Sequence, residues 1–332
     1  RNKLPKGSEV FDQVGKNLIN WLPGYTVSAL ARMHAQIANW RRLWEVREVR
    51  LVVVHEDVAE NTRSLVQFAK ARGTPTLHVP HFNHGTIPGE PPDLHDALNC
   101  DYVAVAGEYM AEWYERRGVD SSRIRITGHP QWDRFAAMRP DRYFGHGSLR
   151  TNPALKTVLY CADWVLWTTL CYDEQTPVLG WQTMLEAFRM LQREGWQLIC
   201  KAHPGAKDTT AQWHAQMAKN ADVGCTVSAR HLDIMLQAAD VVVSNGFSNV
   251  ITEAALVGVP GLTLGPGYLD QEAVPSVDYD AEALYRTVKG AHEQRRVWSE
   301  NLRGPFIERY AGPNDGLATQ RILDWCRELA GG

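Results

Sequence analysis

The stretch ADVVVSNGFSNVITEAALVGVPGLTL, residues 239–264, decides the fold of this chain. Val241, Val242 and Val243 form a short apolar run without polar alternation, which is typical of a strand buried on both faces of a parallel sheet. A polar turn, a helical pattern and a second apolar run follow it. The stretch therefore predicts a strand, a turn, a helix and a second strand within an α/β domain.

The polar turn lies where the helix begins, and a helix N-terminus carries partial positive charge that suits a phosphate group. Its hydroxyls, amides and backbone N–H groups are candidate contacts for a donor nucleotide, and they belong to Ser244, Asn245, Gly246, Ser248 and Asn249. Glu253 falls on the first turns of the same helix, where its carboxylate would reach a ribose hydroxyl. The alternative is an ordinary connection in which Ser and Asn only cap the helix.

Composition limits the class of protein. At 332 residues and 44% hydrophobic, the chain can bury a sizeable core, and its length favours two domains. A net charge of -3 with 22% charged residues argues against nucleic acid or another bulk polyanion as partner. The 6 cysteines are widely spaced, which favours buried thiols of a reducing compartment over a disulfide framework or a zinc site. No apolar run reaches the roughly 20 residues that span a bilayer. We expect a cytoplasmic protein, and association with a membrane surface stays open.

Strand and helix signals alternate along the chain, which predicts an α/β fold with parallel sheets. The strands are expected in two series, at 51–54, 76–79, 102–106 and 124–127, and then at 157–161, 198–201, 241–244 and 261–264. A segment at 139–153, rich in Gly, Pro, Arg and Asn, is the expected linker. We therefore expect an N-terminal domain at 1–145, a nucleotide-donor domain at 150–314, and a last helix in 315–332 that crosses back. Because the first series is short, the first domain is either reduced or the chain is a piece of a longer protein.

A second phosphate contact is expected after the strand at 198–201. Lys201 ends that strand, and His203 follows in the sequence Ala202-His203-Pro204. In parallel sheets, ligands gather at the carboxyl ends of the strands. An imidazole at this place could donate to a phosphate oxygen, and Lys201 would add positive charge. The alternative is that the His-Pro pair is only a structural turn.

Three residues after strands of the first series are candidates for a general base. His84 lies in the sequence His84-Gly85-Thr86, whose turn would fix the imidazole near an acceptor hydroxyl. Glu56 and Asp57 follow the first strand and could serve instead, although Asp57 fits helix capping equally well.

A metal site is not expected. His78, His81 and His84 recur every three residues, but in an extended segment they would not all point one way. No Cys or carboxylate completes a tetrahedral set beside them. We therefore expect no metal and no cofactor.

In this order, the motifs resemble those of nucleotide-diphosphate-sugar transferases of the GT-B fold, and most closely the CDP-glycerol glycerophosphotransferases of teichoic-acid synthesis. The likeness runs from about residue 51 to about residue 329. The matching motifs are His84-Gly85-Thr86 with Pro88, Lys201-Ala202-His203-Pro204 and Asp315-Gly316-Leu317-Ala318.

The resemblance implies two Rossmann-like parallel-sheet domains that face each other across a cleft, with the nucleotide in the second domain and the acceptor in the first. It implies His84 as the base and His203 as a contact of the donor diphosphate. The activated sugar would be a co-substrate, and the acceptor a hydroxyl of a glycan or another molecule in polysaccharide biosynthesis.

Two departures leave the donor open. The serine-rich turn of that family is replaced by the sequence from Ser244 to Ser248, and Thr252-Glu253-Ala254 resembles UDP-sugar enzymes, including the non-hydrolysing UDP-N-acetylglucosamine 2-epimerases. A His-Pro pair with a serine-rich turn also resembles the CMP-sugar sialic acid and Kdo transferases. We expect metal-independent, base-assisted transfer of a sugar or a glycerophosphate-like group to a hydroxyl. The alternatives are a 2-epimerase-like isomerase and a non-catalytic fragment that binds a nucleotide-sugar.

Overall fold

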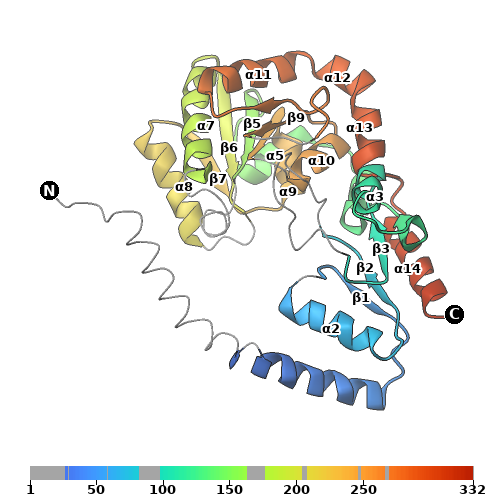
Figure 1. The fold of residues 1–332 in the computed structure, drawn as a ribbon. Coiled ribbons are helices and arrows are strands. Elements are labelled where there is room, and N and C mark those ends of the chain that lie inside the picture. The colour runs from blue at the N-terminus through green and yellow to red at the C-terminus, as the bar shows by residue number, and fades with distance from the viewer. Residues whose placement is uncertain are drawn as a thin grey trace, which may run out of the picture. The chain divides into compact units, whose positions relative to one another are not determined.

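The computed structural model describes residues 27–28, 30–57, 59–81, 98–162, 176–203, 208–245, 248–265 and 269–331 (Figure 1). The chain divides into two compact units. The first consists of Arg1–Pro80, Ala97–Val103 and Trp325–Gly332, and the second of His81–Asp96 and Ala104–Asp324. The second unit runs through the expected boundary at residues 145–150, and the expected division into domains stays a prediction.

The first sheet has the strand order β1-β2-β3-β4. Its strands are β1 (Val52–Val54), β2 (Thr76–His78), β3 (Tyr102–Val105) and β4 (Ile124–Ile126), close to the four expected ranges. β1 pairs with β2, and β2 with β3, in parallel. Apolar side chains of β1 and of helix α2 (Glu60–Lys70) share one core with Cys100. A further helix covers residues 30–46, and the edge of Trp44 packs on Phe68 of α2.

The second sheet has the order β10-β9-β8-β5-β6-β7, and every pair is parallel. Four strands confirm the expected series: β5 (Lys156–Cys161), β6 (Trp196–Lys201), β8 (Val241–Asn245) and β9 (Gly261–Leu264). Two were missed, β7 (Cys225–Ser228) and β10 (Ser276–Val277). Both lie at sheet edges, where a half-buried or very short strand has little apolar signal.

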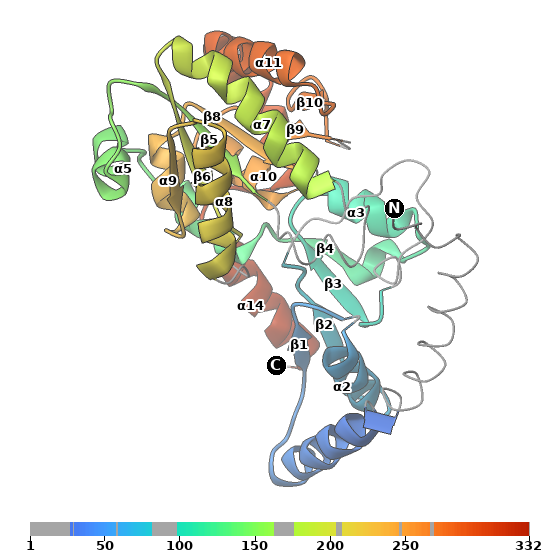
Figure 2. The same ribbon diagram turned by 90° about the vertical axis from the view of Figure 1, so that its left-hand side faces the viewer.

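Helices cover both faces of this sheet. α7 (Thr176–Arg193) and α11 (Ala281–Glu293) bury their apolar sides against one face, in a core that includes Tyr160, Val243 and Leu264. Figure 2 shows α7 lying over the strands. α10 (Asn249–Leu256) packs on the opposite face, where Ile251 lies directly against Gly261. Two further helices of this part are α8 (Asp208–Asn220) and α9 (Leu232–Ala238).

The segment 139–153, expected as a linker without regular structure, contains helix α5 (Arg142–Leu149), which packs on α9. A Cβ added at Gly145 would lie 2.8 Å from the backbone nitrogen of Ala238, so the two helices approach as closely as glycine allows. Arg142 also donates to Asp240 Oδ1 at 2.8 Å, and Asp240 Oδ2 accepts the Thr157 N–H at 2.7 Å. These bonds fix the segment to the amino end of the sheet.

The chain after the second sheet returns to the region of α3 (Glu108–Glu115) through α12 (Arg295–Asn301) and α13 (Arg303–Tyr310). Arg309 donates to both carboxylate oxygens of Glu112, at 3.2 and 2.9 Å. Gly312 has φ +69°, and a Cβ there would meet the carbonyl oxygen of Ala106 at 2.1 Å, so only glycine fits.

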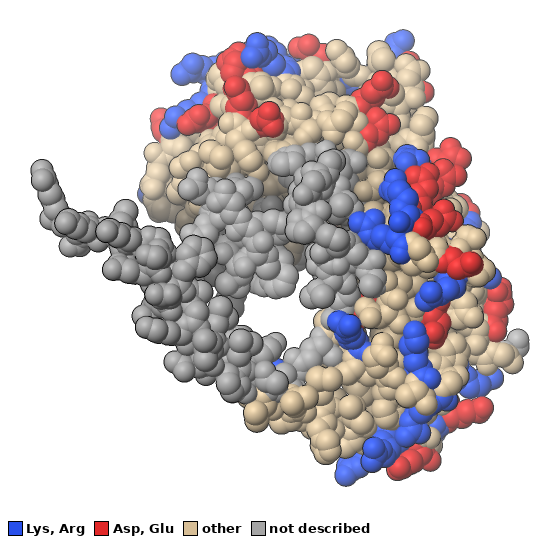
Figure 3. Space-filling view, in the orientation of Figure 1, with Lys and Arg blue, Asp and Glu red and all other residues tan. Residues whose placement is uncertain are grey.

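Short helices and one long helix complete the fold, namely η2 (Ser121–Arg123), η3 (Pro130–Trp132), α4 (Asp133–Ala136) and α14 (Ala318–Leu329). In the first unit, the rings of Trp325 and Tyr102 meet with centroids 5.8 Å apart. None of the helices in the described residues is both long and apolar enough to cross a membrane. On the face drawn in Figure 3, basic and acidic side chains intermix over the described surface, so no large field of one sign forms there.

Candidate nucleotide site at the carboxyl edge of the second sheet

One row of residues crosses the second sheet near its carboxyl edge. Cys161 of β5 is in register with Lys201 of β6 on one side and with Ser244 of β8 on the other. The row continues with Thr263 beyond Ser244 and with Ser228 beyond Lys201. Partners in parallel register project from the same face of a sheet. The structure therefore places Lys201 and Ser244 on one face of the sheet, although 42 residues (202 to 243) separate them in the sequence.

Helix α10 begins at the end of β8 and presents its N-terminus at this edge. Ser248 is the N-cap, and its Oγ accepts the Val250 N–H at 3.3 Å. Asn249 Nδ2 donates to the carbonyl oxygen of His81 at 3.0 Å. The capping interpretation and the phosphate interpretation are compatible, because a side-chain cap satisfies one N–H and leaves other N–H groups of the first turn directed outward. Gly246 lies outside the described residues.

Glu253 is buried on α10, with 8% of its surface exposed. Its Oε1 accepts a hydrogen bond of 3.1 Å from the indole Nε1 of Trp132. Burial raises the pKa of the Glu253 carboxyl, while the bond from Trp132 and the charges of Arg134 and Lys201 lower it. The carboxyl group has a second oxygen with which to accept hydrogen bonds from hydroxyl groups.

The positive charge of Lys201 and an N–H donor of His203 would suit an anion. Desolvation by surrounding atoms lowers the pKa of His203, and the positive charge of Lys201 lowers it further. His203 is therefore a neutral imidazole at pH 7, and it can donate one N–H. Burial raises the pKa of the Cys161 thiol to about 12, so Cys161 is a neutral neighbour and not a nucleophile.

Asn245 is not placed with Ser244. Its Oδ1 accepts the hydroxyl of Tyr160 at 3.0 Å on the face covered by α7. Tyr160 in turn stacks on Trp181, with ring centroids 5.0 Å apart. A Cβ added at Gly180 would lie 2.8 Å from Asn245 Nδ2. The Asn245 side chain is thus part of the core on the opposite face from Ser244.

The candidate bases belong to other parts of the chain. His84 lies outside the described residues. Glu56 is half-buried in the first unit. Asp57 is buried there, and its Oδ2 accepts the backbone N–H groups of Asn99 at 2.7 Å and Cys100 at 3.2 Å. The N-cap of α2 is Ala59, without a side-chain cap, so Asp57 holds a loop instead of capping that helix.

The sequence analysis did not identify Trp132 as a site residue. Trp132 is 3% exposed, and its ring packs on that of His129 with centroids 4.7 Å apart. Nothing in the sequence relates Trp132 to Glu253, because the two are 121 residues apart. One signal in the sequence could have pointed to it, because Trp132 follows closely after the strand at 124–127. A buried tryptophan usually needs a hydrogen-bond acceptor for its indole N–H.

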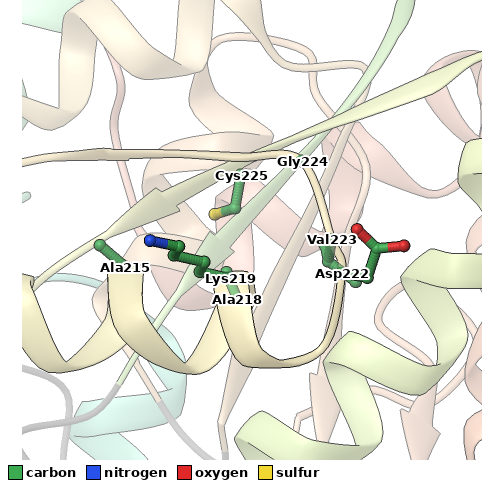
Figure 4. Close-up of a pocket in the computed structure, with 7 residues that line it drawn as sticks. All are labelled: Ala215, Ala218, Lys219, Asp222, Val223, Gly224 and Cys225. Atoms are coloured by element: carbon green, nitrogen blue, oxygen red, sulfur yellow. The ribbon is translucent and has the colours of Figure 1, made fainter.

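Within the described ranges, no group of three or more His, Cys, Asp or Glu side chains could hold a metal ion. A separate pocket of about 310 Å³ lies between α8 and the start of β7, at the amino edge of the sheet and away from the site above (Figure 4). It is lined by Ala215, Ala218, Lys219, Asp222, Val223, Gly224 and Cys225.

No protein-family model matches the chain, and no curated protein matches it. Several solved structures are similar to it. A UDP-GlcNAc 2-epimerase from Neisseria meningitidis bound to UDP-GlcNAc superposes with a TM-score of 0.62 at 13% identity, over 89% of this chain and 81% of the other. A glycosyltransferase from Rickettsia africae ESF-5 gives 0.58 at 11% identity, over 90% and 81%. The wall teichoic acid polymerase TagF gives 0.51 at 13% identity, over 78% and 69%.

These similarities show the fold. The chain has the α/β architecture with two parallel sheets and Rossmann-like organisation that its GT-B neighbours share, as the sequence predicted. At such identities, the fold alone does not define the activity.

Proposed function

We propose that this chain is a nucleotide-sugar-dependent glycosyltransferase whose donor diphosphate binds at the carboxyl edge of the second sheet. The observation that carries the proposal is the convergence of Ser244, Lys201 and the capped N-terminus of α10 on one edge and one face. Backbone N–H groups, a hydroxyl and an ammonium group are the donors that phosphate oxygens need. Glu253 follows on the same helix as the acceptor for ribose hydroxyls.

The reaction we propose is one displacement. The acceptor oxygen forms a bond to the anomeric carbon, the bond from that carbon to the diphosphate oxygen breaks, and the acceptor proton passes to a base. The electron pair leaves with the nucleoside diphosphate, whose charge the α10 N-terminus, Lys201 and His203 stabilise. For the base we propose His84. The backbone at His81, three residues earlier, is bonded to Asn249 at the first position of α10.

A second candidate function is a 2-epimerase-like isomerisation of a UDP-sugar. It is supported by the fold shared with a 2-epimerase that binds UDP-GlcNAc. An isomerase of this kind would need acidic side chains around the sugar to eliminate and re-add the nucleotide. A third candidate is binding of a nucleotide-sugar without turnover.

The test begins with thermal unfolding in the presence of CDP, CMP, UDP, GDP and TDP. A nucleotide at about 100 times its dissociation constant adds roughly 2.7 kcal/mol to the stability of the folded state. The matching activated sugars are then incubated with and without hydroxyl acceptors. Consumption that requires an acceptor supports the transferase, and consumption of UDP-N-acetylglucosamine without one supports the isomerase. If no nucleotide stabilises the protein, the proposed donor site is wrong.

A further inference from the structure

The indole N–H of Trp132 occupies one oxygen of the Glu253 carboxylate, and this bond lies inside the second unit. Both side chains are at least nine-tenths buried. In the described part of the chain, Trp132 is the one hydrogen-bond partner recorded for the Glu253 side chain. A hydrogen bond from a rigid donor to one oxygen fixes the orientation of a buried carboxylate. Because the carboxylate is planar, the same bond also fixes the direction in which its other oxygen points.

The turn that carries Trp132 is itself held on both sides. Asp133, the next residue, accepts the N–H groups of Ala318 and Thr319, each at 2.8 Å, at the start of α14. Gly128 has φ +80°, and a Cβ there would lie 3.0 Å from the Ala318 side chain and from the Pro313 carbonyl oxygen. The backbone on both sides of Trp132 is thus held at the start of α14, so the indole N–H donates to Glu253 from an anchored turn.

We propose that Trp132 is a positioning residue that sets the selectivity of the site for ribonucleotides over 2′-deoxyribonucleotides by holding Glu253 toward the ribose hydroxyls. The inference rests on the proposed function, because it takes Glu253 as the residue that accepts from the ribose. A carboxylate accepts hydrogen bonds from two adjacent hydroxyls only in a narrow range of orientations. A carboxylate that rotates freely before binding loses conformational entropy when the ribose binds, and this loss reduces the binding free energy.

The same bond affects ionisation. A donor to the carboxylate favours its charged form, so loss of the Trp132 N–H raises the pKa of Glu253 further. The charged or titratable groups that face Glu253 are Arg134 on α4, Lys201 on β6, Cys161 on β5 and Asp233 on α9. Because the ionised form accepts both hydroxyls, ribose affinity falls as the pH drops through the pKa of Glu253. In a variant without the indole N–H, this fall occurs at higher pH.

The experiment measures the affinity of the parent and of Trp132→Phe for the nucleoside diphosphate that stabilises the parent, and for its 2′-deoxy form, by calorimetry from pH 5 to pH 8. Phe keeps an aromatic ring in the core and removes the N–H, and the loss of ring volume that accompanies the change is the same in the control below. The ratio of the two affinities is expected to fall about fivefold to tenfold, the equivalent of one hydrogen bond. The midpoint of the pH dependence is expected to move to higher pH. On a Glu253→Ala background, Trp132→Phe should leave the ratio unchanged.

Trp298→Phe is the matched control, because Trp298 is also a buried indole of the second unit, and its N–H donates to the Ala273 carbonyl oxygen at 2.8 Å. Trp298→Phe should lower the unfolding temperature and leave the ratio of the two nucleotide affinities unchanged. If Trp132→Phe weakens both nucleotides equally, with the same ratio and the same pH midpoint, Trp132 is only structural and the proposal is overturned.

Trp132→His is the second variant, since a smaller ring with an N–H donor should keep part of the preference, and it carries the test if the Phe variant does not fold. A folded His variant that binds nucleotide with no preference also overturns the proposal. If Glu253→Ala has the same affinity ratio as the parent, Glu253 does not bind the ribose, and that part of the proposed function fails instead. If Glu253→Ala removes the preference and Trp132→Phe keeps it, only the present inference fails.

Discussion

Trp132 Nε1 and Glu253 Oε1 lie 3.1 Å apart across 121 residues of sequence. This bond joins the turn after β4 to helix α10 after β8, so the helix whose N-terminus we propose as the phosphate site is fixed from the side by the turn that follows the first strand series. The neighbouring Asp133 fixes the same turn to α14. Three segments far apart in sequence thus define the surroundings of one carboxylate.

Ser248→Asp is expected to weaken nucleoside diphosphate binding on the order of 10- to 100-fold, because it sets a carboxylate beside the phosphates. Asp and Asn both cap helices as well as Ser does, so α10 should remain intact in either variant. Ser248→Asn is therefore the matched control and should bind like the parent. Calorimetry measures both affinities, and equal affinity of the Asp and Asn variants would contradict the placement of the diphosphate.

Glu253→Gln is expected to lose nucleotide affinity modestly, because Gln still accepts one hydrogen bond, and Glu253→Ala should lose more. The parent should also bind more weakly as the pH falls through the raised pKa of Glu253, whereas the Gln variant should show no such dependence. Affinities from pH 5 to pH 8 check both points. Parent-like binding by both variants would mean that the ribose is recognised elsewhere.

His84→Ala is expected to reduce turnover about 10²–10⁴-fold and to leave donor affinity nearly unchanged, as for loss of a general base. Glu56→Gln and Asp57→Asn are the rival variants. Asp57 accepts two backbone N–H groups in a buried place, so Asp57→Asn should also destabilise the first unit. Unfolding measurements therefore accompany the kinetics. Near-parent turnover of His84→Ala, with loss of activity in a stable Glu56→Gln variant, would move the base to Glu56.

His214 is expected to make the fold sensitive to acid. Its ring is 1% exposed and packs between Trp181 and Trp213, with centroids 5.0 Å from each. Neither ring nitrogen has a hydrogen-bond partner among the described residues. Burial lowers its pKa from 6.5 to about 4. The unfolded chain therefore binds the proton first, and stability falls between pH 6.5 and pH 4, by roughly 3 kcal/mol in total.

His214→Leu should remove this dependence. Between pH 7 and pH 5 the parent should lose roughly 2 kcal/mol of unfolding free energy relative to the Leu variant. Urea unfolding at the two pH values measures the difference, with His231→Gln at an exposed position as control. If parent and Leu variant lose the same stability on acidification, burial of His214 does not control the acid sensitivity.

Arg303→Met is expected to destabilise the protein by roughly 2 kcal/mol, because it removes the cap at the C-terminal end of α10. Arg303 donates to the carbonyl oxygens of Ala255 and Leu256, at 2.6 and 2.9 Å. Arg296→Met is the control, since Arg296 is exposed and its ion pair with Glu300, one turn away, lies at the surface. Denaturant unfolding should separate the two variants, and equal stabilities would show that the cap contributes little.

Local pattern was enough for most of the fold. The run Val241–Val243 and the Ser-Asn turn after it lie within a few residues of one another, so a strand, a turn and a helix could be predicted from one stretch. The position of Lys201 and Ser244 at one edge of the sheet followed from the rule that carboxyl ends of parallel strands share an edge. The strand period of two could also have separated the side chains of Ser244 and Asn245, which lie on opposite faces.

The sequence by itself determined the elements whose signals are local, namely the eight strands expected at 51–54 through 261–264 and the polar turn and helix that follow Val243. Only the tertiary structure decided that Trp132 holds Glu253, that Asp57 holds a loop, and that α5 packs on α9 where a linker was expected. Each of these rests on a contact between residues far apart in the chain. Sequence periodicity reports which face of an element is buried, but the partner that covers that face is chosen only when the whole chain packs.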